Sequence, residues 1–201
     1  MRNKKMIIIL VIFIIVLITF FCIFYYKNIN NGNTISNKSE EKIIDDILNM
    51  KSYNALISIK ITTNKNETNY VVTQKIEDGK AYQEIQEPEN LAGVITEYDG
   101  KNLKIRNNKL NLETTFQDYQ YIVENRLWID SFIEEYKHGE NTKIESSEDE
   151  IILQISRNDT PYNVIKKLYI SKKTCTPTKM IVQDINQKTL VYILYTEIRI
   201  S

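Results

Sequence analysis

The stretch NYVVTQKIEDGKAYQEIQ, residues 69–86, sets the architecture of this chain. Apolar and polar side chains alternate in Asn69–Glu77 and again in Lys80–Gln86, and the dipeptide Asp78-Gly79 separates the two runs. A period of two places one set of side chains on each face of a strand, and Asp-Gly is a strong signal for a two-residue hairpin turn. The stretch therefore predicts two antiparallel strands joined by a tight turn.

The same pattern continues on both sides of this hairpin. Antiparallel strands need only short turns, so a run of such segments indicates a meander. About ten strands are expected, and a sheet of that width usually curls. The sequence predicts an α+β fold, a curved antiparallel half-barrel with helices on its concave face. The other strand-like segments are 57–62, 94–98, 103–105, 110–112, 151–155, 164–171, 180–185 and 190–200.

Two stretches have helical spacing instead. The first begins at Ser39, a good N-cap, and carries apolar residues on one stripe as far as Leu48. The second is expected from Glu124 to Lys137, with Asn125 as its cap and Gly139 as its stop.

The N-terminal part predicts a membrane anchor. Residues 6–26 contain no charged side chain and are almost wholly apolar, and such a helix would be about 30 Å long, the thickness of a bilayer core. Basic residues precede this run, so the N-terminus should stay in the cytoplasm. We expect a cytoplasmic tip (1–5), a transmembrane helix (6–26), a flexible linker (27–38) and an extracytoplasmic domain (39–201) that makes this a single-pass membrane protein.

Two alternatives to the anchor are weaker. A cleaved signal peptide has a shorter apolar region and ends in small residues, which are absent after this one. Lipidation at Cys22 would need small residues before the cysteine, where Phe20 and Phe21 stand. Cys175 is then the only cysteine of the outer domain, so no disulfide is expected there.

Charge and composition exclude several classes of function. The chain has 26 basic and 26 acidic residues; four basic residues and no acid lie in 1–27, so 22 basic against 26 acidic residues remain, a net charge of −4. A nucleic-acid binder usually has a basic excess, so no nucleic-acid partner is expected. One His, two Cys and five Gly leave little for a His/Cys metal site or a phosphate-binding loop, so we expect no metal and no cofactor.

The residues that could carry catalysis are better explained otherwise. His138 fits a cation at a helix C-terminus, and nothing near Cys175 marks it as a reactive thiol. Paired carboxylates could hydrolyse cell-wall sugars, but no fixed spacing sets any acidic pair apart from a solvated face. We expect no enzyme and no catalytic residues; the acidic groups in question are Glu40-Glu41, Glu134-Glu135 and Glu148-Asp149-Glu150.

Aromatic residues are the candidates for contact with a partner protein, because Tyr and Trp are enriched at interfaces. The alternative is that they close the protein's own core. The last strand has apolar residues on both faces, with Tyr192, Leu194 and Ile198 on one, so it is either central or an edge that could pair with a second copy in a homodimer. The candidate contact residues are Tyr119, Tyr121, Trp128, Tyr192 and Tyr195.

Four stretches carry a resemblance to a known family. They are EPENLAGVITEYDGKNLKI (87–105), LWIDSFIEEYK (127–137), EDEIILQI (148–155) and KLYISKKTCTPTKMIVQDINQKTLVYILYTEIRI (167–200). The outer domain resembles the GerS germination lipoprotein family of anaerobic spore-formers. The runs Pro88–Gly93 and Pro177–Met180 are its most specific parts, and neither is a catalytic motif.

The resemblance implies a LolA/LolB-like fold and a non-enzymatic role. Proteins of this family bind the cortex-modifying amidase CwlD and license its activity during spore formation, so an N-acetylmuramoyl-L-alanine amidase is the implied partner. The chain departs from the family at the lipobox, where an apolar helix would supply the anchor. The alternative that the same fold suggests is a carrier of lipids or lipoproteins in the cell envelope, which would need an apolar cavity.

Overall fold

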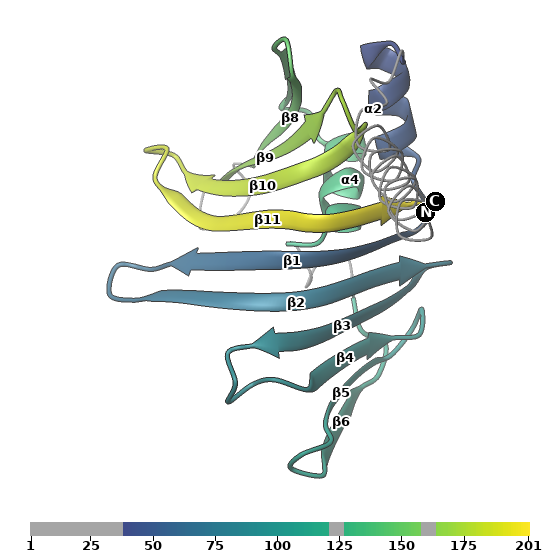
Figure 1. Cartoon of the computed structure of the whole chain (residues 1–201), viewed down its shortest axis with the longest axis vertical. Coiled ribbons are helices and arrows are strands. Elements are labelled where there is room, and N and C mark those ends of the chain that lie inside the picture. The colour runs from purple at the N-terminus through teal and green to yellow at the C-terminus, as the bar shows by residue number, and fades with distance from the viewer. Residues whose placement is uncertain (1–37, 121–126, 158–163) are drawn as a thin grey trace, which may run out of the picture. The chain divides into compact units, whose positions relative to one another are not determined.

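The computed structural model describes residues 38–120, 127–157 and 164–201. In those residues eleven strands form one antiparallel sheet, accompanied by two helices, α2 (Glu40–Leu48) and α4 (Ile129–His138) (Figure 1). The strands are β1 (Tyr53–Thr62), β2 (Glu67–Glu77), β3 (Lys80–Glu87), β4 (Val94–Tyr98), β5 (Leu103–Asn107), β6 (Leu112–Phe116), β7 (Thr142–Ser146), β8 (Glu150–Arg157), β9 (Val164–Ser171), β10 (Thr176–Asp184) and β11 (Thr189–Ile200).

The sheet consists of two meanders that meet at its centre. Its strand order is β6-β5-β4-β3-β2-β1-β11-β10-β9-β8-β7, so β1 and β11 are neighbours although they lie at opposite ends of the domain sequence. Their pairing runs from Tyr53 opposite Ile200 to Ile61 opposite Val191. Beyond the pairing, the backbone N–H of Ser201 donates to the carbonyl oxygen of Ser52 over 3.1 Å. β6 and β7 are left as the two edges of the sheet.

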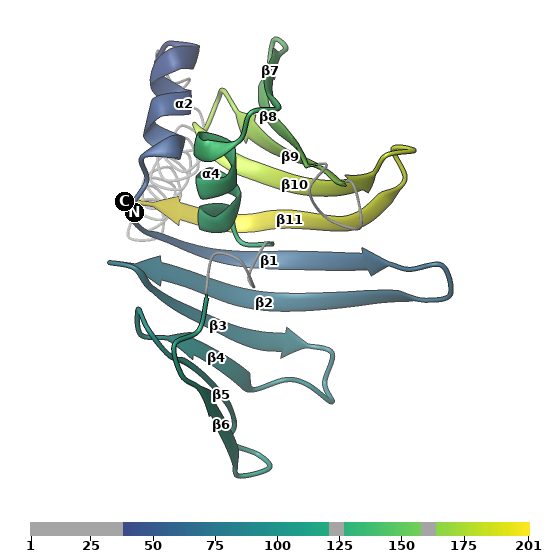
Figure 2. The ribbon, with the colours of Figure 1, turned by 180° about the vertical axis from the view of Figure 1, so that it is seen from behind.

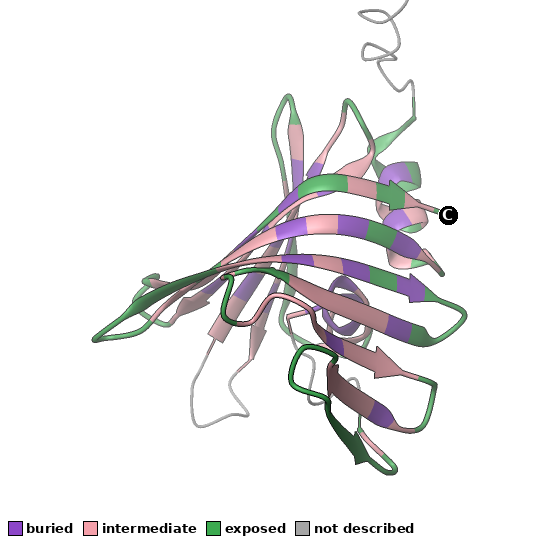
Figure 3. Cartoon of the chain, turned by 60° about the horizontal axis from the view of Figure 1, so that its bottom comes forward, coloured by how far each residue is buried: buried purple, intermediate pink, exposed green. Residues whose placement is uncertain are grey.

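The core lies on the concave face, between the sheet and the helices. Buried and more exposed residues alternate along the strands (Figure 3), as expected for a sheet with one covered face. Figure 2 shows α4 in front of the half of the sheet formed by β8–β11, where Phe132 and Ile129 are fully buried. α2 adds Ile43 and Ile47 to the same cluster.

The predicted sheet is confirmed, with one strand more than expected. The hairpin at Asp78-Gly79 joins β2 to β3, and both turn residues have positive φ (50° and 74°), as a type I′ turn requires. The additional strand is β7, whose sequence has almost no apolar alternation because four of its five residues are exposed.

The first helix begins where it was predicted, and the second does not. Ser39 caps α2, since its hydroxyl oxygen accepts a hydrogen bond from the N–H of Lys42 over 3.3 Å. The start expected for the second helix at Glu124, with Asn125 as cap, falls outside the described residues, and α4 begins only at Ile129. Its N-cap position is occupied by Trp128, which makes no capping bond with its side chain.

Gly139 ends α4 for a different reason from the one predicted. Its φ is −84°, so it does not adopt the left-handed conformation of a C′ glycine. A Cβ atom at this position would lie 2.6 Å from Cδ1 of Ile155 and 2.8 Å from the carbonyl oxygen of Glu135. Glycine is therefore needed because the end of the helix approaches β8 closely.

The last strand is central, which is the first of the two alternatives that its pattern left open, so it is not an edge along which two copies could pair. β11 pairs with β1 on one side and with β10 on the other. A bulge shifts its register, because Ile57 faces Tyr195 while Leu56 faces Glu197. The extra residue moves Ile198 to the core side together with Tyr195, and the prediction that Ile198 shares a face with Tyr192 was therefore wrong.

No helix in the described residues is long and apolar enough to cross a bilayer. The predicted tip (1–5), the predicted transmembrane helix (6–26) and the linker as far as residue 37 lie outside the described residues. The expectation of a membrane anchor thus stays a prediction.

A buried ion pair fastens α4 to the sheet. The ammonium group of Lys166 on β9 lies 2.7 and 2.9 Å from the two carboxylate oxygens of Glu135, and Arg157 on β8 approaches the same carboxylate at 3.3 Å. The side chains of Lys166 and Glu135 are only 3% and 9% exposed. The expectation that Glu134 and Glu135 both lie on a solvated face was therefore wrong for Glu135.

Replacing Glu135 should destabilise the domain strongly. A Glu135→Gln variant leaves Lys166 buried without its anionic partner, which typically costs about 3 kcal/mol. We expect a drop of that size in the free energy of unfolding, measured by urea titration with Trp128, the only tryptophan, as the fluorescent reporter.

The neighbouring Glu134 provides the matched control. Its side chain is 44% exposed and lies 3.5 Å from His138. Glu134→Gln should change the free energy of unfolding by no more than about 0.5 kcal/mol. Equal effects of the two substitutions would mean that the buried ion pair does not hold α4.

Candidate protein-binding surface

The edge strand β6 and the turn before it carry the largest group of exposed apolar side chains in the described part of the chain. All five of its residues are exposed. Leu110 and Leu112 are 64% and 63% exposed, and Phe116 is 46% exposed. We call the surface formed by Leu110, Leu112, Phe116 and the adjoining Tyr119 the β6 patch. Exposed apolar clusters of this kind mark sites of protein contact.

The apolar side chains of β6 point to the concave side of the sheet. Phe116 lies opposite Leu103, a buried residue of β5 that belongs to the concave row, and Leu112 shares the face of Phe116 because side chains alternate. The other face of β6 is polar, with Glu113 in an ion pair with Lys104 at 3.2 Å. Only one face of this edge strand is therefore suited to an apolar partner.

Tyr119 joins the β6 patch to the core. Its ring lies 6.4 Å from the ring of Phe116 and 6.5 Å from that of Tyr98, the second contact being edge-to-face. Such aromatic pairs add stability beyond the area that they bury. Phe116 therefore packs against the ring of Tyr119, while the rest of its side chain is exposed to solvent.

The turn between β4 and β5 holds Tyr119 in place. The carboxylate of Asp99 accepts hydrogen bonds from the backbone N–H groups of Asn102 and Lys101, which lower the pKa of Asp99. The carbonyl oxygen of Lys101 then accepts a hydrogen bond from the N–H of Tyr119 over 2.8 Å. Asp118, directly before Tyr119, has a φ of 50° and pairs with Lys101 at 3.3 Å.

The structure separates the five predicted contact residues. Tyr119 and Tyr192 are half-buried, and contact with a partner stays a prediction for both. Trp128 and Tyr195 are 6% and 7% exposed and belong to the core cluster. Their side chains are therefore too deeply buried for contact with a partner. Tyr121 lies outside the described residues.

Tyr195 is buried at an energetic cost. Within the described residues its hydroxyl finds no hydrogen-bond partner. Burial raises the pKa of this hydroxyl far above its usual value, and the nearby carboxylate of Asp130 raises it further. The hydroxyl is therefore neutral at any physiological pH and contributes no bond to the core.

Removing this hydroxyl should leave the protein as stable as before. Burying a polar group without a partner costs free energy that no hydrogen bond returns, so Tyr195→Phe should be neutral or raise the free energy of unfolding by about 1 kcal/mol. Urea unfolding measures this change.

Tyr53→Phe is the contrasting variant. The hydroxyl of Tyr53 donates to the side-chain oxygen of the buried Gln74 over 3.1 Å. Its loss should lower the free energy of unfolding by about 1–2 kcal/mol. A comparable loss in Tyr195→Phe would show that its hydroxyl has a partner in solution.

The residues considered for catalysis occupy structural positions. His138 is 80% exposed at the end of α4, and Glu150 pairs with Lys179 at 3.5 Å. Cys175 is half-buried in the turn before β10. No group of three or more potential His, Cys, Asp or Glu ligands that could hold a metal ion occurs among the described residues.

A lipid carrier would need an apolar cavity, and the space beneath α4 is filled by side chains. Phe132, Ile129, Leu153, Leu168 and Met180 are each 0% exposed there. One hollow of about 540 Å³ lies at the turns after β2 and β4, where lysine, glutamate and aspartate side chains line it together with Ala81, Tyr82 and Tyr98. Among the described residues, the space between α4 and the sheet therefore offers no cavity of this kind.

Comparison with protein families identifies the family of this chain. The family model described as "Sporulation protein YdcC-like" matches residues 3–200, almost the whole sequence. The chain belongs to the YdcC-like sporulation protein family. No curated protein sequence matches it.

Solved structures share the fold of this YdcC-like protein. A chain of the complex of the CwlD amidase from Clostridioides difficile with the GerS lipoprotein matches with a TM-score of 0.50 and 24% identity, covering 81% of this chain and 96% of the other. An uncharacterized conserved protein from Thermus thermophilus matches with a TM-score of 0.50 and 12% identity, covering 82% and 88%.

A third structure, the LolA superfamily protein NE2245 from Nitrosomonas europaea, matches with a TM-score of 0.41 and 12% identity, covering 82% of this chain and 94% of the other. The resemblance to the GerS family that the sequence suggested is confirmed by the sporulation family and by the shared fold.

Proposed function

We propose that this chain is a non-enzymatic partner of a cell-wall amidase in sporulating cells, and that the β6 patch is its contact surface. The amidase is an N-acetylmuramoyl-L-alanine amidase of the CwlD type, which the chain binds and licenses. The observation that carries the proposal is the exposed apolar edge in a YdcC-like sporulation protein whose fold matches a chain of the CwlD–GerS complex.

The β6 patch has the features of a protein interface. Leu112 and Phe116 supply apolar area, and Tyr119 supplies a ring with a polar end, the combination found in the centre of many interfaces. Among the described residues the backbone of β6 is paired with β5 alone, so a strand of the partner could add to the sheet. Affinity would come from both sources.

The proposal includes the location of this contact. We expect residues 6–26 to anchor the chain and the domain that begins at residue 39 to lie outside the cytoplasm, in the forespore envelope. A cortex-modifying amidase works in that compartment, so a tethered partner would concentrate it at the membrane surface.

The test is binding of the full chain to a CwlD-type amidase from the same cell. The full chain is solubilised in detergent, and its dissociation constant for the amidase is measured by biolayer interferometry. Phe116→Asp and Leu112→Asp should each weaken binding about tenfold or more, because a charge in an apolar contact must be desolvated.

Ile185→Asp is the matched control. Ile185 is 63% exposed in the turn between β10 and β11, at the far side of the sheet from β6. It should bind like the unaltered chain. Equal loss in all three variants would remove the β6 patch from the proposal, and absence of any binding by the unaltered chain would refute the amidase partnership itself.

A further inference from the structure

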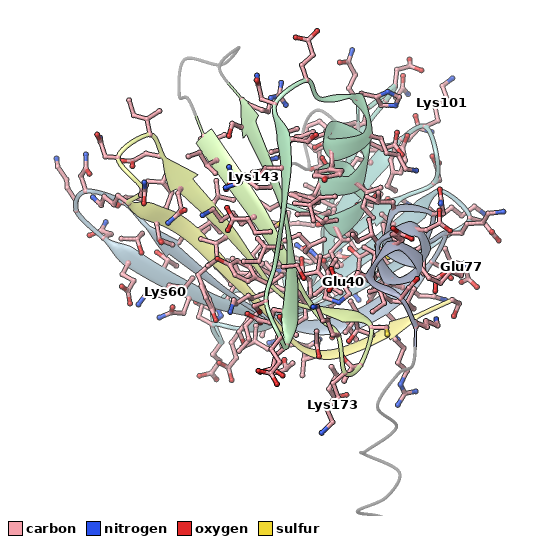
Figure 4. All side chains as sticks on the ribbon, turned by 90° about the horizontal axis from the view of Figure 1, so that it is seen from above. Glu40, Lys60, Glu77, Lys101, Lys143 and Lys173 are labelled. Carbon is pink, nitrogen blue, oxygen red and sulfur yellow. The ribbon has the colours of Figure 1, made fainter. Side chains whose placement is uncertain are left out.

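The sequence of β7, the second edge strand of the sheet, is complementary to an antiparallel copy of itself. Its sequence is Thr-Lys-Ile-Glu-Ser, with Ile144 at the centre and 51% exposed. Lys143 and Glu145 flank it symmetrically and form an ion pair along the strand. β7 pairs with β8 alone among the described residues, and Figure 4 shows it from above with Lys143 labelled.

The backbone groups that face away from β8 can be identified. The N–H of Ser147 donates to the carbonyl oxygen of Glu150, and the N–H of Ser156 donates to that of Asn141. Hydrogen-bonded pairs alternate along an antiparallel ladder, so residues 143 and 145 also face β8. The N–H and C=O groups of Thr142, Ile144 and Ser146 therefore point outward from the sheet edge.

These outward groups suit an antiparallel copy of the same strand. If a two-fold axis passes through Ile144, Ile144 faces its own copy and Thr142 faces Ser146 of the other chain. Each of these is then a hydrogen-bonded pair, in which both residues exchange N–H and C=O contacts. The same register sets Lys143 of each chain opposite Glu145 of the other, and opposite charges directly across a strand pair are favourable.

Natural edge strands usually carry charged side chains that prevent pairing with a strand of another molecule. Here the two charges have opposite signs and a spacing of two, so a two-fold axis converts them into two attractive pairs. Beyond the strand, Glu140 would face Glu148, which confines the pairing to the five residues of β7. Lys172 and the nearby Ser146 lower the pKa of Glu40 on α2, and the backbone of Ser146 is still directed to the edge.

We propose that two copies of this chain associate through β7, antiparallel and with the two-fold axis at Ile144, so that the two sheets become continuous. β6 does not have this property, since a two-fold axis at its centre would set Glu113 opposite Thr115 without any charge pair. A five-residue contact buries less area than a stable standard-size interface, so the association is weak and depends on protein concentration. The inference is independent of the amidase proposal.

A cysteine cross-link tests the register. Cys22 and Cys175 of the full chain are replaced by serine, and Ile144→Cys is introduced. Facing residues in a hydrogen-bonded pair have Cα atoms about 5.5 Å apart, which a disulfide can span. The detergent-solubilised chain should form covalent dimers under mild oxidation. Thr142→Cys is the control, because in the proposed register two copies of residue 142 lie roughly 14 Å apart.

Charge reversal tests the pairing independently of the intrachain ion pair. Lys143→Glu gives one chain with two acidic side chains on this strand, and Glu145→Lys gives one with two basic side chains. Each variant alone repels its own copy, whereas a mixture restores both attractive pairs between chains. With Ile144→Cys in both and different tags, heterodimers should exceed homodimers at least about threefold.

The outcomes are distinguishable. Preferential cross-linking at residue 144 and an excess of heterodimers support the two-fold pairing. Equal cross-linking at residues 142 and 144, or a statistical mixture of dimers, overturns it. Thermal unfolding of each variant shows whether the domain is folded, and a folded Ile144→Cys variant that forms no dimer also overturns it.

Discussion

The pairing of β1 with β11 holds the two halves of the domain together. Each meander forms from neighbouring strands with short turns, and among the described strands this is the only backbone pairing between the two meanders. It brings together residues about 140 positions apart, such as Ala55 and Ile198, and closure of so long a loop costs entropy. The buried side chains of the two strands, among them Ile57 on β1 and Ile193 on β11, supply apolar burial that offsets this cost.

One consequence is a sheet with two open edges and one covered face. α4 covers the β8–β11 half, where the ion pair between Glu135 and Lys166 fixes its end. No described helix covers β6, and its apolar side chains are exposed as a result. The same topology leaves β7 at the other edge, so the two surfaces best suited to contacts with other chains lie as far apart as the sheet allows.

The predictions succeeded where local pattern determines structure. Asp78-Gly79 and Ser39 act through their own backbone and nearest neighbours, and both behave as expected. The predictions failed where contact with an element distant in sequence determines the conformation or the burial of a residue. Gly139 is required by contact with Ile155, and Glu135 is buried because Lys166 comes from another strand. A bulge opposite Leu56 decides which face of β11 carries Ile198.

For the candidate site as well, local pattern predicted less than the contacts between distant elements determined. The sequence predicted a strand only at residues 110–112, whereas β6 runs from Leu112 to Phe116, so the exposed Phe116 was not among the predicted strand or contact residues. Trp128 and Tyr195 were predicted to contact a partner because aromatic residues are enriched at interfaces. In the structure both lie in the core, whereas Phe116 is exposed. Whether an apolar side chain is buried depends on what packs against it, and this cannot be read from the residue alone.

The linear chain was sufficient to predict most of the strands and their turns, the α+β class and the kinship with sporulation proteins. These depend on period, turn chemistry and similarity, all of which are present in the order of the residues. The assembled sheet alone established that the last strand is central, which edges are open and which charges are buried. Those properties arise from contacts between residues far apart in sequence, because burial and edge position belong to the whole sheet and not to any one strand.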